Sequence, residues 1–325
     1  MSIMITGGAG FVASTLVGRL LAAGERVVAI DNLCRGSLRN LTEYAAHPNL
    51  EFLELDVCDL PRLRAAVKRS CVTEQITEVW HLAANSDIPA GVEDPDVDLQ
   101  NTFITTFNTL LVMREYRIPS LLFSSSSAIY GNHGEEILRE TSGPLFPISN
   151  YGAMKLASEA QISAAAEHFL DRAVIFRFPN VVGVPATHGV ILDLIRKLKL
   201  DPAVLHVLGN GSQQKSYLHV TDLVDAMLFV RERAPSGIDV FNVGPIDEGV
   251  RVSDIAAAVV AAVAPGARTV FGASDRGWVG DVPKFRYCVE KLTALGWVPS
   301  LGSAEAVRLA VREIAMQEGF VCARQ

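Results

Sequence analysis

The sequence is poor in cysteine and in basic charge, and each shortage argues against a class of protein. Its five cysteines, at positions 34, 58, 71, 288 and 322, are scattered and lack CxxC spacing, which speaks against a disulfide framework and a structural zinc site. We expect reduced thiols and no metal. Lys and Arg number 29 against 36 Asp and Glu, for a net charge of -7, so binding to nucleic-acid phosphates is not expected.

A long hydrophobic run is also missing. The densest apolar stretch, 255–264, is bounded by Asp254 and by Pro265-Gly266, which is typical of a buried helix and too short for the roughly 18 residues that a membrane helix needs. The N-terminal MSIMITGG enters a strand-like run without the basic start of a signal peptide. The sequence therefore predicts a cytoplasmic protein without a membrane partner.

The composition is that of a globular chain, with 325 residues of which 49% are apolar and 20% charged. In the first half, short apolar runs alternate with helical patterns, which indicates an α/β fold with a doubly wound parallel sheet of the Rossmann type. The expected strands are 2–6, 26–30, 50–55, 78–83 and 120–124, and the expected helices are 11–23, 60–70, 101–116 and 151–169.

The spacing of apolar residues becomes irregular after Arg177, where Gly and Pro are frequent. We therefore predict a dinucleotide-binding domain over residues 1–178, to which the chain returns around 216–244. Residues 179–325 are expected to form mainly a smaller, substrate-binding domain.

A glycine-rich turn follows the first expected strand. The segment TGGAGFVA, residues 6–13, stands between that strand and a helix. Gly7 and Gly10 allow a tight turn and a close approach to a pyrophosphate, and the helix N-terminus at Phe11 and Val12 presents free N–H groups to it. Because a glycine turn alone is weak, its place between strand and helix is what predicts a dinucleotide site.

A carboxylate at the end of the second expected strand bears on which dinucleotide binds. Asp31 can accept both ribose hydroxyls and repel a 2′-phosphate, which favours NAD over NADP. The nearby Arg35 leaves NADP open, and the alternative for Asp31 is a turn residue before Asn32.

Tyr151 and Lys155 form a YxxxK pair on an expected helix, so their side chains share one face. A strand ending in FSSSSAIYG, residues 123–131, precedes them. Lowering the pKa of a tyrosine from about 10 to about 7 needs roughly 4 kcal/mol of differential stabilisation. The Lys155 ammonium and the positive nicotinamide ring of the oxidised cofactor can supply it jointly, while Ser126 aligns the substrate oxygen.

Short motifs in a fixed order run along nearly the whole chain. They are TGGAGFVA (6–13), DNL (31–33), HLAA (81–84), SSSSAIYG (124–131), YGAMK (151–155), RFPNVVG (177–183), YLHVTD (217–222), FNVG (241–244) and GDVP (280–283). Together they resemble the extended short-chain dehydrogenase/reductase superfamily, in its NAD-dependent nucleotide-sugar epimerase/dehydratase branch.

The resemblance implies catalytic roles for Ser126, Tyr151 and Lys155 and a bound NAD. The cofactor-binding positions that it implies are Gly7, Gly10, Asp31, Asn32, Asp56, Val57, Ala83, Asn101 and Lys155. It places Asn180 near a nucleotide sugar, and a homodimer is expected because the helices equivalent to 101–116 and 151–169 pair across a dimer axis in relatives. His81 is expected to be a packed, structural histidine.

Members of this family share oxidation of a sugar hydroxyl and differ in the next chemical step. The 4,6-dehydratases carry an acidic pair after the catalytic hydroxyl residue, and decarboxylases often carry a glutamate there, whereas this sequence has Ser127 and Ala128. The remaining residues suffice for a 4-epimerase, which takes hydride from C4 and returns it to the other face of the sugar. We expect that isomerase activity, with UDP-glucose and UDP-galactose as the default pair.

Several substrate positions depart from the family pattern. Its RD(Y/F) segment reads Lys215-Ser216-Tyr217, and the arginine before GDVP is replaced by Trp278, with Arg276 two residues earlier. We expect Lys215 and Arg276 to contact the diphosphate. Ser86, in the loop 85–87, is expected near the sugar hydroxyls, where Asp87 can equally cap the next turn.

Two alternatives stay open. A dehydrogenase, decarboxylase or dehydratase of the same family would leave NADH, carbon dioxide or a keto sugar behind. A non-catalytic NAD-binding regulator would usually have lost the tyrosine or the lysine, and both are intact here.

Overall fold

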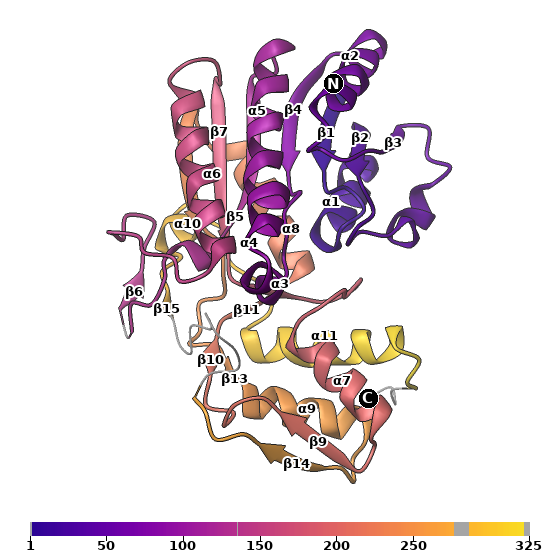
Figure 1. Ribbon diagram of the computed structural model, residues 1–325, viewed down its shortest axis with the longest axis vertical. Helices are drawn as coiled ribbons and strands as arrows, with labels where there is room; N and C mark the ends of the chain where they lie inside the picture. Colours follow the sequence, from indigo (N-terminus) through magenta and orange to yellow (C-terminus); the bar gives the residue numbers. More distant parts are fainter. Residues whose placement is uncertain (1, 135, 276–285, 322–325) are drawn as a thin grey trace. The chain divides into compact units, whose positions relative to one another are not determined.

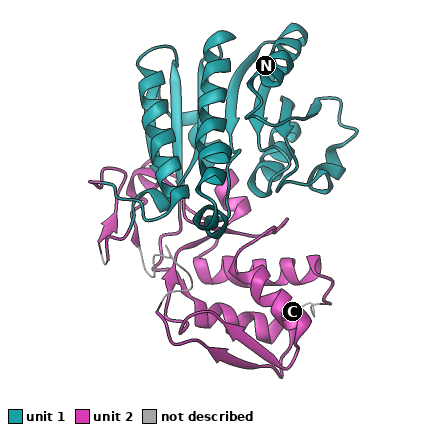
Figure 2. Ribbon diagram, in the orientation of Figure 1, with its two compact units in different colours: residues 1–131, 145–177, 227–241 teal, residues 132–144, 178–226, 242–325 magenta. Residues whose placement is uncertain are grey.

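The computed structural model describes residues 2–134, 136–275 and 286–321. The chain forms two compact units (Figure 2). The first comprises residues 1–131, 145–177 and 227–241, and the second comprises 132–144, 178–226 and 242–325. The chain thus enters the second unit at 132–144, returns to the first for 145–177, and returns to it once more at 227–241.

The first unit is built on a seven-stranded sheet in the order β12-β7-β5-β4-β1-β2-β3 (Figure 1). Neighbouring pairs from β3 through β2, β1 and β4 to β5 are parallel. The strands are β1 (Ser2–Thr6), β2 (Arg26–Asp31), β3 (Leu50–Glu54), β4 (Ile76–His81), β5 (Ser120–Ser126), β7 (Arg172–Phe178) and β12 (Gly237–Asn242). The predicted doubly wound parallel sheet is confirmed.

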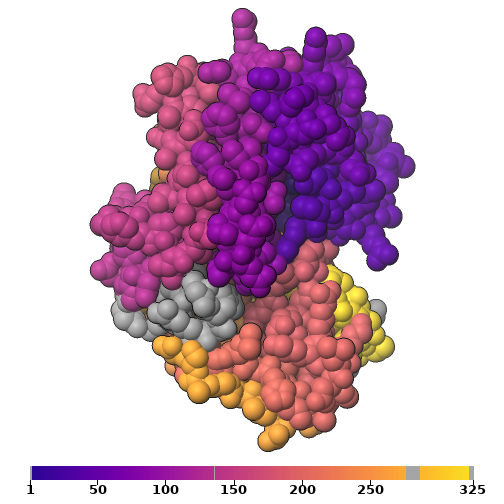
Figure 3. All heavy atoms as spheres, in the orientation of Figure 1, coloured from indigo at the N-terminus to yellow at the C-terminus, as the bar shows by residue number. Residues whose placement is uncertain are grey.

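Helices cover the sheet because its strands are apolar on both faces. All five residues of β1 are buried, so neither face of this central strand meets water. Helices α2 (Leu60–Thr73), α5 (Thr105–Glu115) and α6 (Asn150–Ala166) pack on one face through residues such as Leu63, Met113 and Ile162. Figure 3 shows α5 on the molecular surface of this unit. The remaining helical segments are α1 (Phe11–Ala22), η1 (Leu38–Tyr44), α3 (Ile88–Glu93), α4 (Pro95–Asp98), η2 (Leu99–Ile104) and η3 (Ser127–Ile129).

One expected helix differs in its first turn. The sequence pattern predicts a helix over 101–116, but η2 is a π-helical segment and the α-helix α5 begins only at Thr105. Apolar periodicity over so few residues does not separate a π turn from an α turn, since the two differ by a single residue in their hydrogen bonds.

The second unit has its own apolar core. Its helices α7 (Val190–Leu200), α9 (Val252–Val263) and α11 (Ser303–Gln317) pack together through residues that include Ile195, Ile255 and Ile314. Its short strands pair in twos: β8 (Asn180–Val182) with β11 (Tyr217–His219), β9 (Val204–Val207) with β14 (Arg268–Phe271), β10 (Gln214–Lys215) with β13 (Val250–Arg251), and β6 (Ile137–Leu138) with β15 (Arg286–Tyr287). The other helices are α10 (Glu290–Ala294) and α8 (Val220–Arg233), which begins in this unit and ends in the first.

The apolar stretch 255–264 falls in α9, as expected, but only Ile255, Ala256 and Val259 in that helix are fully buried. In the described part of the chain, no helix is both long and apolar enough to cross a membrane.

His81, at the end of β4, is part of the core rather than of a ligand site. Its ring is 0% exposed, with Nδ1 2.6 Å from Thr6 Oγ1 and Nε2 3.0 Å from Thr106 Oγ1. Burial, followed by the charge of Lys155, lowers the pKa of His81 to about 3. The structure thus agrees with the expectation of a structural histidine.

This neutral ring makes stability depend on pH. Between about 6.5 and 3 the unfolded chain binds a proton at His81 that the folded chain does not, so His81 lowers stability as the pH falls through that range. By pH 5 the loss from this residue is about 2 kcal/mol. Urea unfolding at several pH values should show a shallower pH dependence in His81→Gln than in the wild type. His168→Gln, at an exposed position, should leave the wild-type slope; equal slopes in all three proteins would contradict the prediction.

Candidate active site

The glycine turn packs directly against the end of β4. Gly7 has φ +69°, and a Cβ on it would lie 2.8 Å from Ala83 N and 2.9 Å from Ala83 Cα. Gly10 N donates to Gly7 O at 3.0 Å and closes the turn, and α1 starts at the next residue, Phe11. Only glycine fits at position 7, because its φ is positive and because a side chain would clash with the backbone of Ala83. The turn thus brings two predicted cofactor residues, Gly7 and Ala83, into contact.

Asp31 ties the end of β2 to this turn. Its Oδ2 accepts from Ala9 N at 3.0 Å and its Oδ1 accepts from Leu33 N at 2.8 Å. Burial raises the pKa of Asp31, and these two backbone hydrogen bonds act in the opposite direction. Asp31 therefore stabilises the turn at Leu33, as the alternative interpretation predicts. Each oxygen has a second lone pair, so the carboxylate also fits a pair of ribose hydroxyls.

The other predicted cofactor residues lie at the ends of neighbouring strands and helices of the same unit. Asn32 Nδ2 donates to Asp56 Oδ2 at 3.0 Å, which joins the ends of β2 and β3. Val57 is buried and its carbonyl accepts from Asn108 Nδ2 at 3.0 Å. The half-buried residues among them are Phe11, Val12, Asp56 and Asn101. A glycine cradle at a helix N-terminus with a carboxylate one strand away fits a dinucleotide.

The three predicted catalytic residues come from two adjacent elements. Ser126 ends β5, and Tyr151 and Lys155 lie one helical turn apart on α6. Lys155 Nζ is 5.8 Å from the centre of the Tyr151 ring and donates to Ser124 O at 2.5 Å. Ser126 hydrogen-bonds the Tyr151 side chain, and its Oγ also accepts from Ala128 N at 3.2 Å. The structure thus brings the predicted group together.

Burial dominates the acid–base chemistry of this group. Burial raises the pKa of Tyr151 to about 12. The hydrogen bond with Ser126 lowers this pKa, and the charge of Asp98 raises it. Burial lowers the pKa of Lys155 to about 7, and the charge of Glu159 opposes that change. Without further positive charge, Tyr151 therefore holds its proton at neutral pH. A cationic ligand beside it would favour the ionised form.

Helix α4 ends at a buried carboxyl, Asp98, that sequence reasoning missed. Asp98 is 0% exposed and its Oδ1 accepts from Asn85 Nδ2 at 2.9 Å. A Cβ on Gly91 would lie 1.7 Å from Asp98 Oδ2, so this carboxyl fills the space that a side chain at position 91 would occupy. No local pattern marks such a contact, because loop closure brings the two residues together.

The loop 85–87 contains two residues for which the sequence predicted a role. Asp87 accepts from Ala90 N at 3.3 Å and pairs with Arg35 Nη1 at 3.0 Å, so the capping role is the one observed. Ser86, the residue expected near the sugar hydroxyls, is exposed.

The predicted substrate contacts Asn180 and Lys215 lie in the second unit. In the parallel pair β8–β11, Asn180 faces Tyr217. Asn180 Nδ2 donates to Ser216 O at 3.3 Å, which brings Asn180 next to the Lys215-Ser216-Tyr217 segment. Arg276, Trp278 and the GDVP segment lie outside the described residues.

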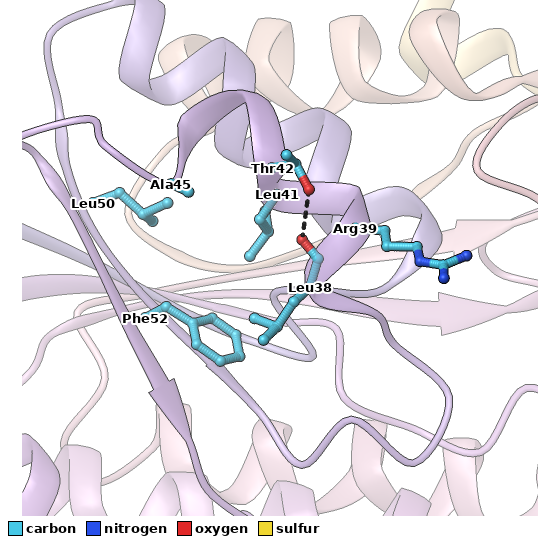
Figure 4. A pocket seen from close by; sticks show the side chains of 7 residues that line it. All are labelled: Leu38, Arg39, Leu41, Thr42, Ala45, Leu50 and Phe52. Carbon is cyan, nitrogen blue, oxygen red and sulfur yellow. Dashed lines mark hydrogen bonds between the residues drawn. The ribbon is translucent and has the colours of Figure 1, made fainter.

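A cavity of about 370 Å³ lies between η1 and β3 of the first unit (Figure 4). Its lining is mostly apolar, and Thr42 Oγ1 donates to Leu38 O at 3.4 Å at its edge. The lining residues are Leu38, Arg39, Leu41, Thr42, Ala45, Leu50 and Phe52. None of them belongs to the predicted site.

Comparison with known proteins gives a consistent family. Residues 3–244 match the model of the NAD dependent epimerase/dehydratase family. A UDP-glucose 4-epimerase of Mycolicibacterium smegmatis is 30% identical over 318 residues, covering 94% of this chain and 96% of that protein. A probable dTDP-glucose 4,6-dehydratase of Sinorhizobium fredii is 31% identical over 259 residues, covering 76% of this chain and 72% of that protein.

The fold matches solved structures over the same length. The crystal structure of Thermus thermophilus UDP-glucose 4-epimerase in complex with NAD superimposes with a TM-score of 0.83 at 30% identity, covering 99% of this chain and 100% of that one. This chain therefore shares its fold with a solved UDP-glucose 4-epimerase, and its sequence is similar to those of relatives named for two different reactions.

Proposed function

This chain belongs to the NAD dependent epimerase/dehydratase family, whose cofactor is NAD, and on that premise we propose that it is a nucleotide-sugar 4-epimerase. A nucleoside diphosphate sugar is the substrate, with UDP-glucose and UDP-galactose as the first pair to examine. Gly7, Gly10 and Asp31 would hold NAD, which would supply a reversible acceptor for a hydride of the sugar.

The residues around Tyr151 supply the proton chemistry. As a tyrosinate, Tyr151 takes the proton of the sugar hydroxyl while the hydride leaves the same carbon, and it returns that proton when the hydride is given back. Ser126 aligns the sugar oxygen, and the Lys155 ammonium stabilises the tyrosinate. The keto sugar must turn over between the two transfers, so that hydride returns to its other face. No net oxidation results.

The observation that carries the choice of reaction is the lack of a carboxyl after Ser126. Positions 127 and 128 hold a serine and an alanine within η3, capped by Ser126 itself. Asp98 is the carboxyl whose charge bears on Tyr151, but it is fully buried and held by Asn85. Elimination of water needs an acid and a base that reach the sugar, and these positions offer neither. Retention of Tyr151 and Lys155 together favours an enzyme over a regulator that only binds NAD.

The test is a panel of nucleotide sugars incubated with the purified protein and no added cofactor. We expect a new C4 epimer in the NMR spectrum, an equilibrium reached from either side, and no lasting NADH absorbance. The panel holds UDP-glucose, UDP-galactose, their N-acetylamino forms, UDP-glucuronate and dTDP-glucose. Accumulated NADH, a keto-deoxy sugar or carbon dioxide would reject the epimerase in favour of another reaction of the family.

A further inference from the structure

A buried ion pair lies one helical turn beyond Lys155. Glu159 of α6 and Arg177 of β7 are 6% and 5% exposed. Their contact is bidentate, with Nε 3.1 Å from Oε1 and Nη2 2.7 Å from Oε2. Arg177 Nη1 also donates to Tyr130 Oη at 2.9 Å. Two parallel charge-assisted hydrogen bonds offset the cost of burying both charges.

The same carboxylate holds the strand that carries Ser126. Ser125 Oγ donates to Glu159 Oε1 at 2.5 Å, and Lys155 Nζ donates to the carbonyl of Ser124 at 2.5 Å. Two consecutive residues of β5 are thus bound to two successive turns of α6. Ser126 comes next in the chain, so its position relative to Tyr151 depends on these two hydrogen bonds.

Glu159 also lies four residues after Lys155, on the same face of α6. Its negative charge raises the pKa of the Lys155 ammonium, whereas burial lowers it to about 7. Loss of the Glu159 charge would therefore shift Lys155 further toward its neutral form. A neutral lysine does not stabilise a tyrosinate.

The other charges near this group do not replace Glu159. His81 of β4 faces Lys155 but stays neutral, and Asp98 of α4 bears on Tyr151 with the opposite effect to an ammonium. β5, η2 and η3 carry no charged side chain, and the charged ends of α3 and α5 are exposed: Glu93, Arg114 and Glu115. Arg172, at the other end of β7, bears on Glu78 and Arg231.

We propose that Glu159, held by its bidentate ion pair with Arg177, is a positioning residue whose negative charge favours the Lys155 ammonium and which holds the end of β5 on which Ser126 lies. The inference rests on the proposed function for its kinetic consequence. Its electrostatic part concerns the titration of Tyr151 and stands without any substrate.

The experiment therefore combines two readouts on the NAD-bound protein. The first is the ultraviolet absorbance of tyrosinate against pH, taken as the difference between each protein and the same protein carrying Tyr151→Phe. The second is the pH profile of kcat and KM for whichever sugar turns over. The variants are Glu159→Gln, Glu159→Asp, Glu159→Gln/Arg177→Met and, as a matched loss of charge at the exposed end of α6, Glu167→Gln.

In Glu159→Gln we expect the Tyr151 titration to move up by about one pH unit, because less of Lys155 is charged. The pH at which kcat begins to fall on the alkaline side should be lower by a similar amount, because Lys155 loses its proton at a lower pH. At pH 8 we expect kcat to fall about tenfold while KM stays within twofold of the wild type. Glu159→Asp should recover part of the shift. Glu167→Gln should titrate like the wild type.

The double variant separates charge from packing. Removing both partners leaves no unpaired buried charge, so its stability should exceed that of Glu159→Gln, while the shifted titration should remain. A folded Glu159→Gln protein with the wild-type Tyr151 titration would overturn the inference. A double variant that regains both the stability and the Tyr151 titration of the wild type would overturn the inference as well. If no sugar turns over at all, the proposed function fails while the titration still decides the role of Glu159.

Discussion

Tyr151→Phe should lower kcat by roughly three orders of magnitude while the protein stays folded and keeps its NAD. The change removes one hydroxyl, the group that takes and returns the proton of the sugar in the proposed mechanism. Its loss corresponds to about 4 kcal/mol of transition-state stabilisation. Because the ring remains and packs as before, KM and the melting temperature should change little. The measurement is kcat and KM at saturating sugar, with bound NAD determined after denaturing the protein.

Tyr116→Phe is the matched control for this prediction. It also removes a single hydroxyl, one that donates to Arg64 O at 3.2 Å, beyond the end of α5 and away from Ser126 and Lys155. Its kcat should stay within twofold of the wild type. If Tyr151→Phe kept more than a tenth of the wild-type kcat, Tyr151 would not be the residue that transfers the proton.

Gly7→Ala should empty the cofactor site and destabilise the first unit. A Cβ would press on the backbone of Leu82 and Ala83 at 2.8–3.0 Å, where no flexible side chain can move aside, and φ is +69°. Backbone strain and overpacking together predict a loss of about 2–4 kcal/mol in the free energy of unfolding. The turn would also leave the position that fits a pyrophosphate, so bound NAD should fall at least tenfold.

Gly24→Ala separates the effect of backbone strain from that of the steric clash. Gly24 has φ +82°, but a Cβ there would meet nothing within 4 Å. This variant has the left-handed strain without the clash, so it should lose about 1–2 kcal/mol and keep its NAD. The readouts are urea unfolding and the NAD content of the purified proteins. Equal losses in the two variants, with NAD retained in both, would show that packing against Ala83 does not shape the site.

Much of the first unit can be predicted from local pattern. Alternating apolar runs and helical stretches predict strands within one or two residues of β1, β2 and β3, because a buried parallel strand needs a continuous apolar run. Gly7, Asp31 and the YxxxK pair could be picked out as candidates in the same way, since each is marked by its place within or next to a single element. The second unit was harder, because its strands are only two to four residues long and have no readable period.

The residues missed were those whose partners are far away in the chain. Glu159 meets Arg177 from another element, and Asp98 fills the space beside Gly91. Asn32 and Asp56 were each predicted as cofactor residues, but their hydrogen bond to each other results from the pairing of β2 with β3. Nothing in the neighbouring residues of either partner marks these contacts.

The sequence by itself determined the doubly wound sheet, the glycine turn at its place between strand and helix, and the identity of the group at Ser126, Tyr151 and Lys155. Only the tertiary structure decided their electrostatics. Whether Lys155 is charged depends on how deeply it is buried and on the charge of Glu159, which pairs with Arg177. Burial and long-range pairing are properties of the packed chain, and they set the pKa values on which a proton-transfer site depends.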